Sequence, residues 1–186
     1  MKTQIKTEKV KARGEIVGAN LKNNGAENQG SSNQGFSLIE LLLVVAVILI
    51  IAAIAIPNFI QSKMRANESA AGQSLRAITT AEVLYSTSYG IGFSPDLPSL
   101  GGSGAVVNPS NAELIDEVLT SGVKSGYSFS YAVLATDALG NVDSFSVNAN
   151  PISPGYTGMR YFYADQTGVI RANVSAPAGP SDLPIQ

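Results

Sequence analysis

The chain has 186 residues, of which 45% are apolar, and a formal net charge of −2, which suits one modest domain with a hydrophobic anchor. It contains no cysteine and no histidine, which excludes disulfides, thiolate or histidine metal sites, and the Ser-His and Cys-His pairs of many hydrolases. Residues 1–35 carry a net charge of +3 and the remainder −5. Because the later basic residues are scattered singly, no nucleic-acid-binding face is indicated.

Residues 1–35 are rich in Lys, Asn, Gln, Gly and Ser and show no hydrophobic periodicity. This composition predicts a disordered leader. A basic flank ahead of an apolar run predicts that the leader stays in the cytoplasm while the C-terminal part crosses the membrane. The alternative is an ordinary secretory signal peptide, cut at Ala52-Ala53-Ile54-Ala55 near the end of an apolar run.

Residues 36–56 form an apolar run in which Ser37 and Glu40 are the only polar side chains. As a helix this run is about 30 Å long, which matches the hydrocarbon core of a bilayer. Glu40 is the anomaly, because a carboxylate within an apolar span is costly in lipid and often marks a function. The simpler interpretation is that Glu40 is tolerated near the membrane surface, with its carboxylate reaching the headgroups.

The junction and the run together resemble the N-terminal segment of type IV prepilins and of the pseudopilins of type II secretion. The shared residues are Gly35, Phe36, Ser37-Leu38-Ile39-Glu40, the apolar run and Pro57. The resemblance covers about a quarter of the chain. Members of the family often carry a glycine in mid-span, where this chain has Leu49.

The resemblance implies cleavage between Gly35 and Phe36 by a prepilin peptidase, which also N-methylates Phe36. It implies that the subunit is held in inner-membrane lipid, then passed to an assembly platform and polymerised with copies of itself. Glu40 and Pro57 are the residues that the resemblance assigns to assembly. No cofactor and no enzymatic activity are implied.

A physical role for Glu40 follows from that cleavage. The new α-amino group on Phe36, with a pKa of about 8, would lie about one helical turn from Glu40. Pairing with the amine of a neighbouring subunit would favour one axial register, because any other register leaves a charge unpaired among apolar side chains. The alternative is a single-span anchor that never leaves the membrane.

Residues 57–89 continue the helix as an amphipathic segment. Pro57 removes one backbone hydrogen bond and predicts a bend. The apolar stripe consists of Ala71, Leu75, Ile78, Ala81 and Tyr85. The polar residues Gln73, Arg76 and Glu82 are expected to lie off this stripe.

Residues 90–126 are expected to form a loop with one short helix from Ser110 to Ser121, capped by Ser110 or Asn111. Residues 127–174 then show the two-residue period of an antiparallel sheet. The first expected strand begins at Tyr127. Three more are expected at 144–148, 160–164 and 168–172, with a turn at 165–168. Residues 175–186 contain three prolines and predict a loose tail.

Asp137, Asn141 and Asp143 surround Gly140 between two expected strands. Oxygen ligands at this spacing could bind calcium, as major pseudopilins do in their β-region, but Asp, Gly and Asn are also the residues that a hairpin turn requires. The turn is the favoured interpretation. Five tyrosines of the β-region, at positions 127, 131, 156, 161 and 163, are expected in the sheet face and core.

The overall expectation is an α+β, pilin-like fold with a long N-terminal helix and an antiparallel sheet of about four strands. The function it indicates is a prepilin, a structural subunit of a type IV pilus-like filament that ends in an extracellular fibre. A pseudopilin of type II secretion, in a periplasmic pseudopilus, is the first alternative. A membrane-anchored periplasmic binding or catalytic domain is the second.

Overall fold

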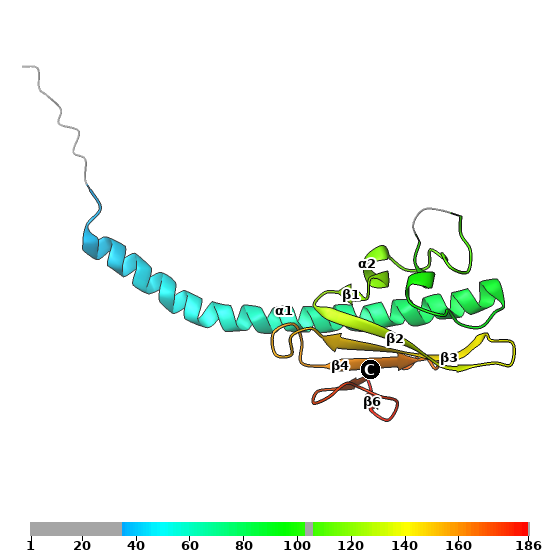
Figure 1. The fold of residues 1–186 in the computed structure, drawn as a ribbon. Helices are drawn as coiled ribbons and strands as arrows, with labels where there is room; N and C mark the ends of the chain where they lie inside the picture. Colours follow the sequence, from blue (N-terminus) through cyan, green and yellow to red (C-terminus); the bar gives the residue numbers. More distant parts are fainter. Residues whose placement is uncertain (1–34, 103–105, 186) are drawn as a thin grey trace, which may run out of the picture. The chain divides into compact units, whose positions relative to one another are not determined.

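The computed structural model describes residues 35–102 and 106–185. One long helix, α1 (Leu38–Tyr89), is followed by a short 3-10 helix η1 (Pro98–Leu100), a short helix α2 (Glu117–Thr120) and an antiparallel sheet (Figure 1). The predicted α+β, pilin-like fold is confirmed, with six strands in place of about four. Residues 42–186 form one compact unit, and the first helical turn belongs to a separate N-terminal one.

Helix α1 contains 52 residues and passes through Pro57 without a break. The stripe of apolar residues predicted for its second half is buried throughout, from Ala71 to Tyr85. Gln73 and Arg76 are exposed and lie off the stripe, but Glu82 is fully buried with the stripe residues, so its predicted place off the stripe is wrong. The second half of α1 is therefore the helical layer of a packed domain.

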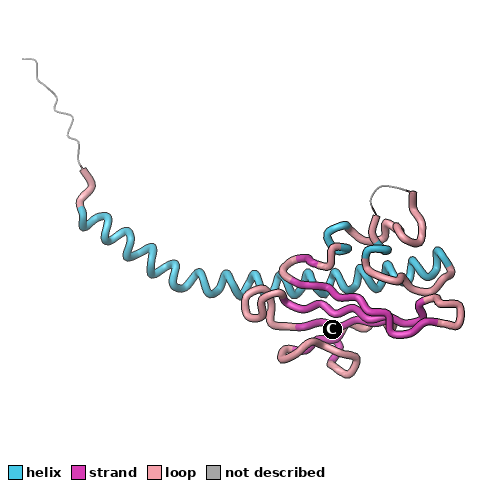
Figure 2. The backbone as a smooth tube through the Cα atoms, viewed as in Figure 1, coloured by secondary structure: helices cyan, strands magenta, loops and turns pink. Residues whose placement is uncertain are grey.

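The sheet is a simple meander in which each strand pairs with the next one in sequence (Figure 2). The strands are β1 (Val123–Lys124), β2 (Tyr127–Thr136), β3 (Val142–Pro151), β4 (Tyr161–Asp165), β5 (Arg171–Asn173) and β6 (Leu183–Pro184). The longest pairing runs from Tyr127 opposite Pro151 to Thr136 opposite Val142. Such local pairing needs only short turns, and the glycines and Asp/Asn residues between the strands supply them.

Alternation along β2 places its aromatic side chains against α1. Tyr127 and Phe129 are buried, and the ring of Tyr131 stacks on Phe145 of β3 with centroids 5.5 Å apart. The predicted turn between β4 and β5 is present, since Gly168 donates to the carbonyl of Asp165 at 2.9 Å and has a φ of +73°. A residue with a side chain would be strained at that φ, which explains the glycine.

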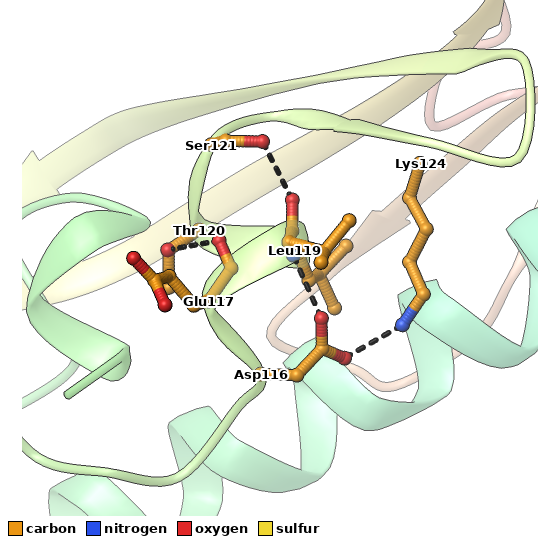
Figure 3. Close-up of polar contacts among 7 residues, drawn as sticks. Asp116, Glu117, Leu119, Thr120, Ser121 and Lys124 are labelled. Carbon is orange, nitrogen blue, oxygen red and sulfur yellow. Dashed lines mark hydrogen bonds and ion pairs between the residues drawn. The ribbon is translucent and has the colours of Figure 1, made fainter. Parts of the chain in front are cut away.

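The helix expected from Ser110 to Ser121 is much shorter than predicted. Only Glu117–Thr120 is helical, and its N-cap is Asp116, whose carboxylate accepts from the amide of Leu119 at 2.9 Å and from Lys124 at 2.6 Å (Figure 3). Glu113 has a φ of +54°, which a helix does not allow. The segment before α2 instead hydrogen-bonds to the backbone of residues 99–101, a tertiary contact that periodicity does not reveal.

The C-terminal segment is paired, so the prediction of a loose tail is wrong. Strand β6 adds to the edge of β5, and Ile185 donates to the carbonyl of Ile170 at 2.9 Å. Asp182 accepts hydrogen bonds from the amide of Gly179 and the side chain of Asn173, both at 2.8 Å. Asn148 of β3 also donates to the carbonyl of Ala178. Polar contacts thus fix the C-terminus in a chain without cysteine.

Candidate processing and assembly segment

The predicted cleavage junction lies in non-helical chain. Residues 35–37 precede α1, and the Phe36 side chain is 91% exposed. Among the described residues, apart from its chain neighbours, no atom lies within 4 Å of the position that a Cβ would take on Gly35. The described residues therefore leave the bond between Gly35 and Phe36 exposed. Residues 1–34 of the predicted leader lie outside the described part of the chain.

Glu40 occupies the first turn of α1, where it makes a local contact. Its carboxylate accepts a hydrogen bond from the backbone amide of Ser37 at 3.2 Å, and the carbonyl of Ser37 accepts from Leu41 at 3.2 Å. This is the N3 side of a capping box, in which Glu or Gln reaches back to the amide before the helix. A negative charge in the first turn also complements the helix dipole.

The capping contact gives Glu40 a role in its own helix that the resemblance does not include. The pattern Ser-x-x-Glu ahead of an apolar run at Ser37 to Glu40 is the sequence signal for it. The contact satisfies one amide and leaves the carboxylate exposed. Glu40 therefore keeps oxygen lone pairs that can accept from a partner outside the chain.

The apolar half of α1 has no protein cover in the described chain. By length and composition it can cross a membrane, and none of its most apolar window is buried. Leu49, at the position where a glycine is common in the family, continues the helix with an exposed side chain. An apolar surface of this size needs lipid or protein around it.

Two buried carboxylates on the packed half of α1, Glu68 and Glu82, hold loops of the domain, a role that the sequence did not indicate. Glu68 is 8% exposed and binds the loop between β3 and β4: it accepts from the amides of Met159 at 2.8 Å and Arg160 at 3.2 Å. The Arg160 side chain donates to it at 2.7 Å. Burial raises the pKa of Glu68, but these hydrogen bonds outweigh it and hold the pKa below its usual value.

Glu82 is held by neutral groups. Its carboxylate accepts from the amide of Ser94 at 2.8 Å and from the Ser94 hydroxyl at 2.6 Å, while Tyr131 donates to the carbonyl of Ser94. Burial raises the pKa of Glu82, and the bonds from Ser94 and Tyr131 only partly oppose this. The cluster fastens the loop after α1 to both the helix and the sheet.

The candidate calcium ligands form a turn. The carboxylate of Asp137 accepts from the amides of Leu139 and Asn141 at 2.8 and 2.9 Å and from the Asn141 side chain at 2.9 Å. Asp143 lies on β3, and no group of three acidic residues in the described ranges is placed to hold a metal. The hydrogen bonds from Asn141 favour the ionised carboxylate and lower the pKa of Asp137.

Comparison with known proteins identifies the segment that contains this junction. Residues 30–56 match the family model described as the prokaryotic N-terminal methylation motif. The stated resemblance to the prepilin-type cleavage and methylation segment is thereby confirmed for these residues.

A relative of this chain supports the same resemblance. The chain is 55% identical over 47 residues to the type IV major pilin protein PilA of Myxococcus xanthus (strain DK1622). The match spans 25% of this chain and 21% of the relative, so it concerns the N-terminal segment alone. A pilin relative fits the expectation of a structural protein without enzymatic activity.

Proposed function

We propose that the chain is a prepilin: it is cleaved between Gly35 and Phe36, N-methylated at Phe36, and assembled from the inner membrane into a type IV pilus-like filament. The observation that carries this proposal is the exposed, non-helical junction directly ahead of a bare apolar helix, within a segment that matches the methylation motif. A prepilin peptidase needs an accessible scissile bond, and the junction offers one.

The bare half of α1 serves twice in this proposal. Before assembly it anchors the subunit in lipid as a single pass, with the basic residues 1–35 in the cytoplasm. In the filament it packs on copies of itself, where small side chains such as Ala46, Ala52 and Ala53 allow close approach. Pro57 follows the apolar run directly. The backbone hydrogen bond that it removes lets the helix bend when the apolar half passes from lipid into the filament.

Glu40 sets the register of the subunit in the filament. Once Phe36 carries an α-amino group, that amine and the Glu40 carboxylate form the charge pair that a neighbouring subunit must complete within apolar surroundings. The exposed carboxylate of Glu40 supports this role, because its local bond to Ser37 leaves it able to accept from the incoming amine.

Intact mass and N-terminal sequence of the protein in sheared surface fibres test the proposal. A product that starts at methylated Phe36 and dominates the sheared fraction establishes a filament-forming pilin. The same product found only in the cell envelope supports the pseudopilin alternative. A chain that retains residues 1–35 in fibres or envelope contradicts processing, and with it the whole proposal.

A further inference from the structure

The loop between β3 and β4, residues 152–160, lies at the end of the sheet from which α1 leaves toward its apolar half (Figure 1). Side chains of α1 hold it there: Asn67 donates to the carbonyl of Thr157 at 2.8 Å, and Glu68 binds the amides of Met159 and Arg160. The position of this loop relative to the helix is therefore fixed by direct contacts.

The loop presents apolar side chains to solvent at this end. Ile152, Tyr156 and Met159 are 53%, 71% and 51% exposed. The expectation that Tyr156 belongs to the sheet face or core is wrong, because it lies in this loop. Met159 also lines a shallow hollow with Met64 and Arg65 of α1, one turn closer to the apolar half than Glu68 is. An exposed tyrosine beside aliphatic side chains is typical of a surface that meets a membrane interface.

Two basic residues of α1 lie at this end of the domain, and one of them, Arg65, lines the hollow with Met159. Lys63 and Arg65 are exposed, and neither has an ion-pair partner among the residues that the structure describes. Lys63 lies about 10 Å along the helix beyond Ile56, and the headgroup layer is about 5 to 8 Å thick. Because helical side chains lean toward the N-terminus, both cations reach back toward that layer.

We propose that these residues form a membrane-docking collar that rests on anionic phospholipid headgroups while the subunit awaits assembly. The collar consists of Lys63, Arg65, Ile152, Tyr156 and Met159. Lys63 follows Phe59, the last exposed large apolar residue of the apolar half of α1, by about one helical turn, so a bilayer around that half brings its headgroups close to the collar. The inference rests on the proposed membrane-anchored precursor. Docking of this kind fixes the domain against the bilayer, and extraction of the subunit must break it.

The absence of tryptophan from the sequence allows a direct test. Single tryptophans are placed in the full chain by Tyr156→Trp in the collar, Leu49→Trp in the apolar run and Leu139→Trp in the β2–β3 turn, which lies at the opposite end of the sheet (Figure 1). Each protein is reconstituted in phosphatidylethanolamine and phosphatidylglycerol vesicles whose acyl chains are brominated near the carbonyl end, and quenching of tryptophan fluorescence is measured.

The expected result is strong quenching for Leu49→Trp, and quenching for Tyr156→Trp that is several-fold greater than for Leu139→Trp. Quenching of Leu49→Trp with Tyr156→Trp no more quenched than Leu139→Trp overturns the collar and leaves the anchor intact. The collar is also overturned if the Tyr156→Trp emission changes only with protein concentration, which indicates a second copy as the partner. An unquenched Leu49→Trp overturns the anchor and the collar together.

The charge requirement is tested on the Tyr156→Trp background. Lys63→Glu with Arg65→Glu is expected to lower quenching several-fold in vesicles that contain phosphatidylglycerol. Arg76→Glu, which reverses an exposed charge on the packed half of α1, is the matched control and is expected to leave quenching unchanged. Equal quenching in all three proteins contradicts recognition of anionic headgroups.

Discussion

The two halves of α1 differ in where their apolar side chains find a partner. From Leu38 to Phe59 every large apolar residue is exposed, whereas from Glu68 to Tyr85 nine residues are buried by the chain itself. In one half of the helix the apolar side chains are covered by the domain itself. In the other half they need cover from lipid or from another protein chain. Sequence periodicity distinguishes them, because the first half is apolar on all sides and the second on one.

The carboxylates of α1 divide in the same way. Glu68 and Glu82 are buried and receive hydrogen bonds from residues distant in sequence, at positions 159–160 and 94. Glu40 is exposed and binds only the amide of Ser37. Changes at Glu68 and Glu82 should therefore alter the stability of the domain, and a change at Glu40 should alter what the chain does with its partners.

The largest effect is expected for Glu40→Gln. Glutamine retains the capping contact with the Ser37 amide but not the charge, so this variant isolates the proposed pairing with the Phe36 amine. An unpaired buried charge costs enough that the yield of sheared filaments should fall by about tenfold or more. Processing at Gly35 is followed by mass in the same cells.

Thermal unfolding of the Glu40→Gln domain should match the wild type, since Glu40 lies outside its core. Normal filament yield and normal filament geometry would show that the charge of Glu40 does not set the register.

Leu75→Ala compares the two halves directly. Leu75 is fully buried under the sheet, so the substitution should lower the free energy of unfolding by about 2–5 kcal/mol. Leu49→Ala removes the same atoms from an exposed position and should leave domain stability unchanged. Denaturant unfolding of both full chains in detergent, followed by tyrosine fluorescence, measures the difference. Equal losses would mean that the apolar half is also part of the folded core.

Glu68→Ala removes the contact that holds residues 159–160 on α1. The amides of Met159 and Arg160 lose a charged acceptor, and we expect a loss of about 1–3 kcal/mol. Because the pKa of Glu68 is lowered in the fold, its contribution is full above its ordinary value of 4.5 and disappears as the pH falls through the folded value. Glu117→Ala, at an exposed position, is the control.

The loss caused by Glu68→Ala should therefore shrink at acidic pH in unfolding curves collected across that range. A loss that is the same at every pH would assign the effect to packing and not to the carboxylate.

Asp182→Ala tests how the C-terminus is held without a disulfide. It removes the acceptor for Gly179 and Asn173, and the domain should lose about 1 kcal/mol or somewhat more. Hydrogen exchange should show a local effect, with faster exchange of the Ile185 amide, which pairs with Ile170. Asp182→Asn keeps one acceptor oxygen, so its stability should lie between that of the wild type and that of Asp182→Ala. Unchanged exchange would show that strand pairing alone holds the tail.

Periodicity predicted the helix and the central strands because their burial repeats along the chain. It failed wherever a contact between distant segments decided the structure. Residues 112–115 hydrogen-bond to residues 99–101 in place of forming a helix, and β6 exists because Asp182 and β5 hold it. At the junction, the Ser-x-x-Glu pattern of Ser37 to Glu40 is a local signal for a capping box. It was not used, because Glu40 was interpreted through the resemblance to prepilins and its distance from the expected α-amino group. Glu82 was placed off the apolar stripe because it is polar, although its spacing of four residues from Ile78 and three from Tyr85 puts it on the same buried face.

Glu82→Gln gives the smallest effect and the one whose sign is least intuitive. Burial favours the protonated carboxyl, so the pKa of Glu82 is raised in the fold. Its favourable contribution is full below the ordinary value of 4.5 and is lost as the pH rises through the folded value. Glutamine is neutral at every pH, keeps an oxygen for the Ser94 amide, and can donate to the Ser94 hydroxyl, which already lies 3.0 Å from the carbonyl of Asp96. The variant should therefore be more stable than the wild type at pH 8, by on the order of 1 kcal/mol, and should lose this advantage at acidic pH. Glu68→Ala should show the opposite trend, with its largest effect at neutral pH. If Glu82→Gln is instead destabilised at neutral pH and this loss shrinks at acidic pH, the hydrogen bonds of the carboxylate outweigh its burial, and Glu82 resembles Glu68.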